Sequence, residues 1–348
     1  MRLAFVTVGD TGRLTGGYLY NARVLAALRD GGVEVEEIVP CGASPEEQEA
    51  AASRFGPVLD PGRYDVIVVD ALARIVCAPH LDRWRGERPI VAMVHELPSV
   101  AAGATSSERE HEEPLLRSDY LVSVSEHGGS ILENRGVPAQ RIRVVQPGFD
   151  RFPTGRSGGS VRGGPVRALC VAQWIPRKGI LDLVQAWALH ERPGASLELV
   201  GETDADPAYA DFVRGAVADA PGASVIVSGP VDDATLGDAY AASDLFVLPS
   251  RYEGYGVVYA EALAHGLPVI ALDVGPVPEL VGEEAALLVP PDDVEALSGA
   301  LDLLLKDAAL RDRMSAAARR RAAALPRWAD TAAGFLRVLN EAVAERTG

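Results

Sequence analysis

Short apolar segments alternate with helix-like patterns along most of the chain. The first half holds six apolar runs of strand length, and the apolar residues between them recur at helical spacing. A second series of the same kind begins near residue 166. This alternation is typical of parallel sheets that are covered by helices. The pattern therefore predicts an α/β protein with two parallel sheets.

The predicted strands are short and mostly apolar. Those of the first half cover residues 3–8, 33–39, 65–70, 89–94, 120–124 and 141–145. Those of the second half cover residues 166–172, 197–200, 224–227, 244–248, 269–271 and 286–288. Predicted helices cover residues 18–29, 108–116, 126–134, 179–190, 208–218, 234–242, 257–264, 294–306 and 310–324, and after Pro326 a final amphipathic helix covers residues 328–345.

The segment of residues 150–165 separates the two series. It reads DRFPTGRSGGSVRGGP, is rich in Gly, Ser, Pro and Arg, and has no apolar period, so it has the character of a linker. We expect two Rossmann-like domains, residues 1–149 and 166–327, that face each other across a cleft. The helix of residues 328–348 is expected to cross back onto the first domain, with Trp328 as its anchor. Open parallel sheets bind ligands at the carboxyl ends of their strands, so the loops that follow strands are the candidate sites.

The composition excludes several classes of function. A net charge of -16 disfavours a nucleic-acid-binding surface, which needs clustered Lys and Arg. No apolar run reaches the roughly 18 residues that a membrane span requires, so we expect no stable membrane insertion. The chain opens on a strand-like segment without a basic and apolar leader. Its three cysteines lie far apart and form no metal-binding pair, which favours a cytoplasmic protein.

The first candidate loop, GDTGRLTGGY, opens the helix after the first strand. Gly16 and Gly17 would let backbone N–H groups approach an anion at the positive end of that helix. The glycine spacing matches neither the dinucleotide motif G-x-G-x-x-G nor a Walker A loop. Because glycine-rich turns are common, this loop alone indicates no particular function.

The second candidate loop, AQWIPRKG, covers residues 172–179. Arg177 and Lys178 precede a predicted helix, where two cations oppose the helix dipole unless an anion lies between them. The chain has only two lysines, Lys178 and Lys306, among many arginines, so a lysine in a loop motif invites a functional interpretation. The pattern favours phosphate binding over a solvated surface.

The third candidate loop follows the strand of residues 244–248 and reads LPSRYEGYGVVYAEALAHGLPVIA as far as residue 271. Glu253 lies in a glycine loop, and Glu261 lies inside the next predicted helix. A helix N-terminus can receive a phosphate, and carboxylates accept hydrogen bonds from sugar hydroxyls. A helical glutamate is nevertheless most often a surface residue, so the spacing of these two indicates little by itself.

The ordered set of motifs is more informative. SDLFVLPSRYEGYGVVYAEALAHGLPVIA resembles the donor-site signature of the retaining GT-B glycosyltransferases of glycosyltransferase family 4, with Glu253 and Glu261 in the places of its paired glutamates. VSVSEHGGSILENRGVPAQRIRVVQPGFD is similar to the end of that family's first domain. LVGETD, VIVSGPVDDATLGDAYAASD and ALLVPPDDVEAL follow in family order, so the resemblance covers nearly the whole chain.

The resemblance implies a donor domain in the second half, which binds a nucleotide-diphosphate sugar, and an acceptor domain in the first. Lys178 would contact the diphosphate, Glu261 the ribose, and Glu253 the sugar and phosphate. His95 would approach the sugar ring, and with Lys178 and Glu253 it forms the implied catalytic set, although a buried structural histidine is the alternative. The implied donor-binding residues are Gly16, Gly17, Gln173, Arg177, Lys178, Gly229, Val231, Glu253, Gly254, Tyr255, Gly256, Val257 and Glu261.

The implied reaction retains the anomeric configuration. The leaving diphosphate would deprotonate the acceptor on the same face, and catalysis would consist of positioning and electrostatic stabilisation. Helix ends and Lys178 supply the positive field, so we expect neither a metal nor a cofactor. Asp204 and Asp206 mimic the metal-binding DxD of another glycosyltransferase fold, but they are expected to form a solvated turn. We expect a UDP-sugar rather than a GDP-sugar as donor, and a small soluble acceptor.

One position departs from the family pattern. Gln173 stands where the family usually has arginine, which removes one of two cations for the diphosphate. A degenerate glycosyltransferase that serves as a nucleotide-sugar-binding or partner subunit would explain this change, but such a protein should also have lost Lys178, Glu253 or Glu261. An epimerase or phosphorylase of the same fold needs no such donor signature. A nicotinamide dehydrogenase is disfavoured by the missing glycine motif.

Overall fold

The computed structural model describes the chain except residues 14, 101–105, 154–163, 221–223 and 348. Two compact units divide it: unit 1 comprises Met1–Gly148 and Pro326–Gly348, and unit 2 comprises Phe149–Leu325. Most of the expected linker, residues 154–163, lies outside the described residues.

Unit 1 is built on a parallel six-stranded sheet with the order β2-β1-β3-β4-β5-β6. Its strands are β1 (Arg2–Val6), β2 (Glu34–Ile38), β3 (Val66–Asp70), β4 (Ile90–Val94), β5 (Tyr120–Ser123) and β6 (Ile142–Val144). The inner strands β3, β4 and β5 are buried along their whole length. Burial on both faces explains why these strands are continuous apolar runs.

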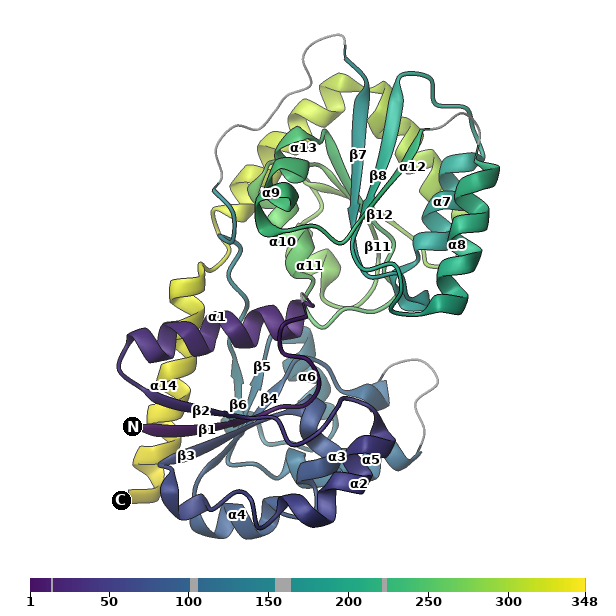
Figure 1. Ribbon diagram of the computed structural model, residues 1–348. Coiled ribbons are helices and arrows are strands. Elements are labelled where there is room, and N and C mark those ends of the chain that lie inside the picture. Colours follow the sequence, from purple (N-terminus) through teal and green to yellow (C-terminus); the bar gives the residue numbers. More distant parts are fainter. Residues whose placement is uncertain (14, 101–105, 154–163, 221–223, 348) are drawn as a thin grey trace. The chain divides into compact units, whose positions relative to one another are not determined.

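The helices of unit 1 lie on both faces of its sheet (Figure 1). They are α1 (Gly16–Asp30), α2 (Pro45–Phe55), α3 (Arg74–Cys77), α4 (Leu81–Glu87), α5 (Ser106–Leu116), α6 (Glu126–Asn134) and α14 (Trp328–Thr347). Helices α2, α3 and α4 were not among the predicted ones. Helix α2 is mostly polar and buries Gln48 and Phe55, and it begins at a capping box in which Ser44 and Glu47 exchange hydrogen bonds.

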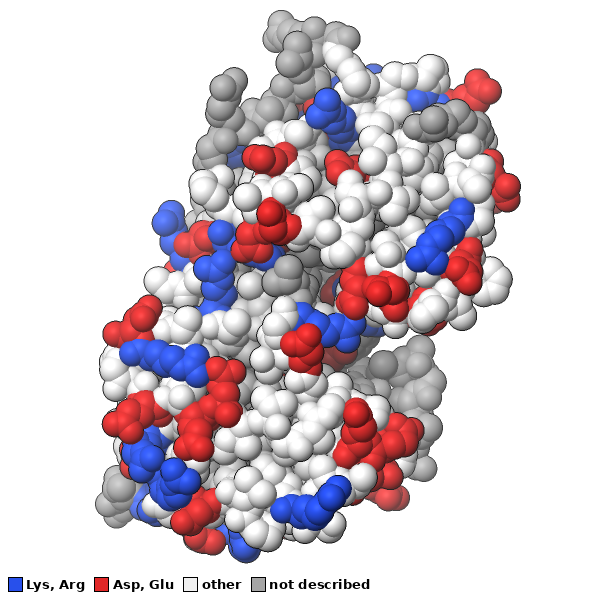
Figure 2. Space-filling model, in the orientation of Figure 1, with Lys and Arg blue, Asp and Glu red and all other residues white. Residues whose placement is uncertain are grey.

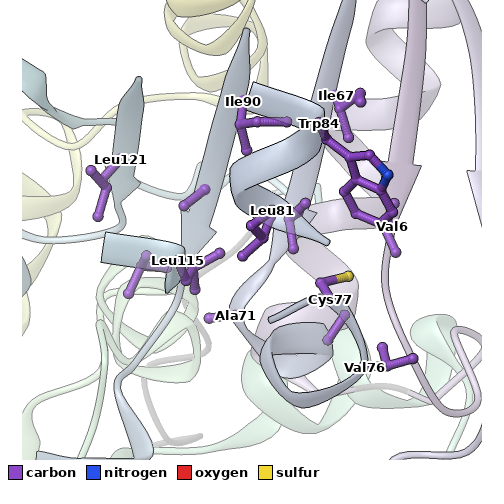
Figure 3. Close-up of a cluster of buried hydrophobic side chains, with 14 of the residues drawn as sticks. Val6, Ile67, Ala71, Val76, Cys77, Leu81, Trp84, Ile90, Leu115 and Leu121 are labelled. Carbon is purple, nitrogen blue, oxygen red and sulfur yellow. The ribbon is translucent and has the colours of Figure 1, made fainter. Parts of the chain in front are cut away.

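An apolar cluster fills the face of the sheet that carries α2 to α5 (Figure 3). The indole of Trp84 is fully buried beside Phe55, whose ring meets it edge-on at 5.6 Å between centroids. Val6 and Ile67 contribute from the sheet. This cluster fixes the strands whose carboxyl ends carry the polar residues described below.

Helix α14 packs on α1 and on strands β3, β4 and β5. Its buried residues include Phe335, Val338 and Leu339. Trp328 lies at its start, with its ring 6.1 Å from that of Tyr20. A Cβ added to Gly148 would lie 2.2 Å from the backbone nitrogen of Trp328, so only glycine permits this close approach of two chain segments.

Unit 2 repeats the same architecture with the strand order β12-β11-β10-β7-β8-β9. Its strands are β7 (Val166–Val171), β8 (Ala195–Val200), β9 (Val225–Gly229), β10 (Leu245–Leu248), β11 (Val269–Leu272) and β12 (Ala286–Val289). Its helices are α7 (Ile180–Ala188), α8 (Pro207–Asp219), α9 (Asp233–Ala242), α10 (Val257–Ala264), α11 (Val277–Val281), α12 (Val294–Lys306) and α13 (Ala308–Ala322). Helices α7, α8 and α12 cover one face, and α9, α10 and α13 the other (Figure 1).

All twelve predicted strands are present, and so are the predicted helices. The predictions of helices 126–134, 257–264 and 294–306 match the observed bounds. Strand β8 begins two residues before the predicted start, and the five-residue helix α11, which has a proline in its first turn, was not predicted. The prediction of two parallel α/β sheets is confirmed.

Among the described residues, no helix is long and apolar enough to cross a membrane. On the face shown in Figure 2, Lys and Arg side chains are interspersed with Asp and Glu and form no continuous basic patch.

We expect Leu339→Ala to lower the free energy of unfolding of unit 1 by about 2–5 kcal/mol, because Leu339 is fully buried and its truncation leaves a cavity. Urea unfolding followed by circular dichroism measures the loss. The exposed Asn340 of the same helix provides the matched control Asn340→Ala, for which we expect a change within about 0.5 kcal/mol. Equal effects of the two substitutions would show that α14 does not stabilise unit 1 through its buried face.

Candidate functional site

The strand order of unit 2 reverses between β7 and β10. From β7 the chain proceeds outward through β8 and β9, and it then returns to β10 on the other side, where Leu245 and Phe246 pair with Ala168 and Leu169. In open parallel sheets, ligands bind outside the carboxyl ends of the strands at such a switch point. The loops concerned are residues 172–179, after β7, and residues 249–256, after β10.

The two loops approach each other closely at Gly179. It adopts a left-handed conformation with φ +67°, and a Cβ at this position would lie 2.2 Å from the carbonyl oxygen of Pro249. The backbone N–H of Arg251 donates a hydrogen bond to the carbonyl of Arg177 over 2.7 Å. Only glycine combines this backbone conformation with so close an approach. The two loops therefore hold a fixed position relative to each other.

Lys178 and Glu253 meet across this junction. The distance from Lys178 Nζ to Glu253 Oε1 is 2.6 Å, and Glu253 is only 7% exposed. Burial acts to raise the pKa of Glu253, but the positive charges of Lys178 and Arg177 and hydrogen bonds from Lys178 and Ser250 outweigh it and lower the pKa below its ordinary value. The carboxylate is therefore charged at neutral pH, and the pair forms a buried salt bridge.

Arg177, the second cation of the loop of residues 172–179, also binds a group of the protein itself. Arg177 Nη1 donates to the carbonyl of Tyr252 over 3.0 Å. The sequence led us to expect an external anion beside Arg177 and Lys178. In this structure their neighbours are the chain's own Glu253 carboxylate and Tyr252 carbonyl, so the two cations do not by themselves require a bound phosphate.

The first turn of α10 has no side-chain cap. Its N-cap residue is Gly256, with φ +98°, which has no side chain to accept a hydrogen bond from the first N–H groups. Tyr255 and Val257 are 5% and 8% exposed, so what this turn offers to a ligand is backbone rather than side chains. Uncapped N–H groups and the helix dipole favour an anion here.

Glu261 lies one turn into α10 and is fully buried. Its Oε2 accepts a hydrogen bond from the hydroxyl of Tyr240 over 3.0 Å, and its Oε1 lies 3.5 Å from Nη1 of Arg151. Burial raises the pKa of Glu261 to about 7, although Arg151 and Tyr240 act to lower it. A ribose that used this carboxylate would have to replace one of these two contacts.

The remaining predicted donor residues lie at neighbouring strand ends. The side-chain amide of Gln173 donates to Oε2 of Glu202 over 2.5 Å. Gly229 ends β9 with φ +67°, and its carbonyl accepts from the backbone N–H of Gly201. Val231 is partly exposed in the segment that follows. Gln173 thus binds a neighbouring glutamate, where an arginine would have added a charge.

Unit 1 has a switch point of its own between β1 and β3. Gly16 and Gly17 form the first positions of α1, and a Cβ on Gly17 would lie 3.3 Å from Cδ2 of His95, which follows β4. The ring nitrogen Nε2 of His95 lies 3.0 Å from Oδ1 of Asn21. The other end of the Asn21 amide donates to Oδ2 of Asp70 over 2.7 Å. His95 is therefore part of a polar cluster, and burial lowers its pKa below the ordinary value.

The structure thus brings Gly17 together with His95 in unit 1, and Lys178, Arg177 and Glu253 together in the loops after β7 and β10 of unit 2. Sequence reasoning missed the partners Asn21, Asp70, Tyr240 and Arg151. Asp70 ends a predicted strand, and Asn21 lies one helical turn after Gly17, so their positions in the sequence could have identified both as site residues. The position of Arg151 gave no such indication, because it lies in the predicted linker.

Asp206, of the DxD look-alike, caps α8 by accepting a hydrogen bond from the backbone N–H of Tyr209 over 3.0 Å. Within the described part of the chain, no group of three or more His, Cys, Asp or Glu side chains is placed to hold a metal ion.

Comparison with known proteins identifies relatives that align with most of the chain. Residues 156–321 match the family model described as "Glycosyl transferases group 1". The chain is 36% identical over 296 residues to D-inositol 3-phosphate glycosyltransferase of Jonesia denitrificans and 31% identical over 301 residues to that of Kineococcus radiotolerans. Each alignment covers 76% of this chain and 68% of the relative.

Solved structures show the same fold. Sucrose-phosphate synthase from Thermosynechococcus elongatus superposes with a TM-score of 0.85 at 24% identity, and the match covers 99% of both chains. The Anabaena protein HepE, solved in complex with UDP and glucose, matches with a TM-score of 0.80 at 19% identity over 98% of this chain and 99% of its own.

The environment of Glu261 predicts a pH-dependent stability. Its pKa rises from 4.5 to about 7 on folding, so between these values the folded protein retains a proton that the unfolded chain releases. Stability therefore falls as the pH rises through this window, by up to about 3 kcal/mol. Glu261→Gln removes this titration, and we expect the variant to gain stability over the wild type as the pH rises from 5 to 8.

Thermal unfolding of both proteins at pH 5 and pH 8 measures this difference. The exposed Glu295 of α12 supplies the control Glu295→Gln, which should follow the wild type at both pH values. A difference between Glu261→Gln and the wild type that does not change with pH would contradict the raised pKa.

Proposed function

The chain belongs to the glycosyl transferase group 1 family, GT4, and we propose that it transfers a sugar from a nucleotide-diphosphate sugar to a small soluble acceptor with retention of configuration. The family and the GT-B fold expected from the donor signature are confirmed. The reaction, its substrates and the roles of individual residues are our proposal.

The observation that carries the proposal is the Lys178–Glu253 pair at the switch point of unit 2. The pair lies in loops that approach each other closely at Gly179, and Glu253 comes shortly before the uncapped start of α10. An ammonium group and a helix N-terminus together stabilise negative charge. A diphosphate leaving group develops such charge as its bond to the sugar breaks.

In the proposed reaction, the oxygen of an acceptor hydroxyl attacks the anomeric carbon on the face from which the diphosphate departs. The bond between that carbon and the phosphate oxygen breaks, and the proton of the hydroxyl passes to the leaving phosphate. Lys178 and the N–H groups of α10 stabilise the departing charge, and Glu253 orients Lys178 and accepts hydrogen bonds from sugar hydroxyls. Positioning and electrostatics then supply the rate enhancement.

We assign the ribose to Glu261 and the base to the backbone around Gly229 and Val231. Ribose hydroxyls are good hydrogen-bond donors, so they can take the place of Tyr240 or Arg151 on the Glu261 carboxylate. We propose a UDP-sugar as donor. HepE was solved with UDP and glucose, whereas a Corynebacterium glutamicum relative, 34% identical over 193 residues, is named as GDP-mannose-dependent, so the test must include both bases.

The acceptor is proposed to be a small soluble polyol or sugar. The names of the Jonesia and Kineococcus relatives point to a phosphorylated cyclitol as their substrate, which is a small polar acceptor. We assign acceptor binding to unit 1, where α1 begins with Gly16 and Gly17 and His95 lies beside Gly17.

A degenerate, nucleotide-sugar-binding subunit is the second candidate. Gln173 favours it, since its amide is engaged by Glu202 and adds no positive charge for a diphosphate. The retained Lys178–Glu253 pair favours the transferase. An assay of donor turnover distinguishes the two candidate functions, because a binding subunit binds the donor without transferring its sugar.

We expect Lys178→Ala to reduce kcat/KM by about tenfold to a hundredfold, because it removes a charge-assisted contact worth roughly 1.5–3 kcal/mol. Release of nucleoside diphosphate from the donor, measured with excess chelator, reports the rate. Lys306→Ala is the matched control: Lys306 is exposed on α12, pairs with Asp302 and should leave the rate unchanged.

Because the substitution leaves Glu253 without its lysine partner, the unfolding temperature of Lys178→Ala is measured first and the assay is run below it. Equal rates for Lys178→Ala and the wild type would refute the role of Lys178 with the diphosphate. Loss of wild-type activity in chelator, with recovery on adding Mg²⁺, would refute the metal-independent reaction.

A further inference from the structure

A chain of buried polar groups leads to His95 at the switch point of unit 1. Thr7 follows β1, Asp70 ends β3, His95 follows β4, and Asn21 projects from α1. Thr7 Oγ1 donates to Asp70 Oδ2 over 3.1 Å, and Asn21 Nδ2 donates to the same oxygen over 2.7 Å. Asp70 and Thr7 are 0% and 1% exposed, and Asn21 is 6% exposed. The cluster is therefore shielded from water, and its hydrogen bonds must be satisfied internally.

The direction of each hydrogen bond follows from the donors available. The backbone N–H of Leu72 donates to Asp70 Oδ1 over 2.9 Å, which fixes one carboxylate oxygen as an acceptor. The other oxygen of Asp70 faces Asn21. An amide oxygen there would set two acceptors against each other, so the NH₂ group of Asn21 must face Asp70. The amide oxygen of Asn21 then faces His95.

This orientation decides where the imidazole of His95 carries its proton. The Asn21 oxygen is only an acceptor, so the ring nitrogen Nε2, 3.0 Å away, must donate. In the neutral ring the proton then resides on Nε2, and Nδ1 has a free lone pair. Burial lowers the pKa of His95, although the charges of Asp70 and Glu96 act to raise it, and the ring is therefore neutral at pH 7.

The ring is held in place by two further contacts. Gly17 has no Cβ, which would otherwise lie 3.3 Å from the ring carbon Cδ2. The ring of Tyr20 meets the imidazole edge-on, with 5.3 Å between centroids. Within the described part of the chain, the bond to Asn21 is the only hydrogen bond to the imidazole, and His95 is partly exposed. Nδ1 is consequently the polar atom that the ring can offer to a ligand.

We propose that Asp70 and Asn21 are positioning residues that hold His95 as its Nε2–H tautomer, so that Nδ1 accepts a hydrogen bond from a substrate hydroxyl. This inference rests on the proposed function, in which His95 contacts substrate. A lone pair on Nδ1 suits a hydroxyl of the transferred sugar or of the acceptor. The same atom repels a phosphate oxygen, which needs a donor. The opposite tautomer would suit a phosphate.

The substitution Asp70→Asn tests the arrangement with almost no change of shape. The Leu72 N–H still requires an oxygen, so the new NH₂ group replaces Oδ2 and donates toward Asn21. Asn21 then turns its oxygen to residue 70 and its NH₂ group to His95. Nε2 must become an acceptor, and the proton moves to Nδ1. We therefore expect this variant to reverse the tautomer of His95.

Nitrogen-15 NMR of the imidazole ring measures the tautomer directly. The chain has six histidines, so comparison with His95→Gln assigns the signals. We expect protonated Nε2 in the wild type and protonated Nδ1 in Asp70→Asn. Asp30→Asn, at an exposed position of α1, is the control and should retain the wild-type signals. Protonated Nδ1 in the wild type, or an unchanged tautomer in Asp70→Asn, would overturn the proposal.

Kinetics supply the functional readout. Asp70→Asn should reduce kcat by about tenfold to a hundredfold, since it replaces one productive hydrogen bond by a repulsive contact. The KM for the donor should change less than threefold, because the proposed nucleotide contacts lie in unit 2. A reversed tautomer with unchanged kcat would refute the role of Nδ1 with substrate. If no variant and no wild type transfers sugar, the proposed function fails, while NMR still decides the tautomer.

Discussion

The contact between Gly179 and Pro249 is the constraint on which the proposed donor site of unit 2 depends. A β-carbon at position 179 would lie 2.2 Å from the Pro249 carbonyl oxygen, so the loops after β7 and β10 approach as closely as backbone atoms allow. This approach places Lys178 Nζ 2.6 Å from the Glu253 carboxylate. Removing one member of a buried ion pair costs about 3–5 kcal/mol, because the other charge is left buried without a partner.

The sheets of both units share one feature of their topology. In each, the strand order reverses next to the first strand of the unit, and the polar residues collect at the carboxyl ends of the strands on either side. In unit 2 the result is the Lys178–Glu253 ion pair in the loops that lead to α10, and the uncapped N-terminus of this helix suits an anion. In unit 1 it is a hydrogen-bonded chain from the Asp70 carboxylate through Asn21 to the neutral imidazole of His95, which suits hydroxyl groups. The two sites thus differ in chemistry although they share a topology.

The inner strands could be predicted because burial on both faces makes them continuous apolar runs, as in β3 and β10. Helix α2 was missed because its sequence is mostly polar and its start depends on a capping box. The order of the sequence motifs identified Lys178 and Glu253 as candidate site residues. Their contact could not be predicted, because it depends on the pairing of β7 with β10. Arg151 was missed because it lies in the predicted linker, and its contact with Glu261 joins positions that are far apart in the chain.

The measurement that tests the account most directly is the calorimetric titration of the wild type with UDP and uridine, and with GDP and guanosine, in the presence of chelator. If Lys178 and the start of α10 bind a diphosphate, one nucleoside diphosphate will bind at least tenfold more tightly than its nucleoside, a difference of about 1.4 kcal/mol. Lys178→Ala will reduce that ratio and leave the affinity for the nucleoside unchanged. Equal affinities of the nucleoside and its diphosphate in the wild type would contradict the assignment of this site to a nucleotide-sugar donor.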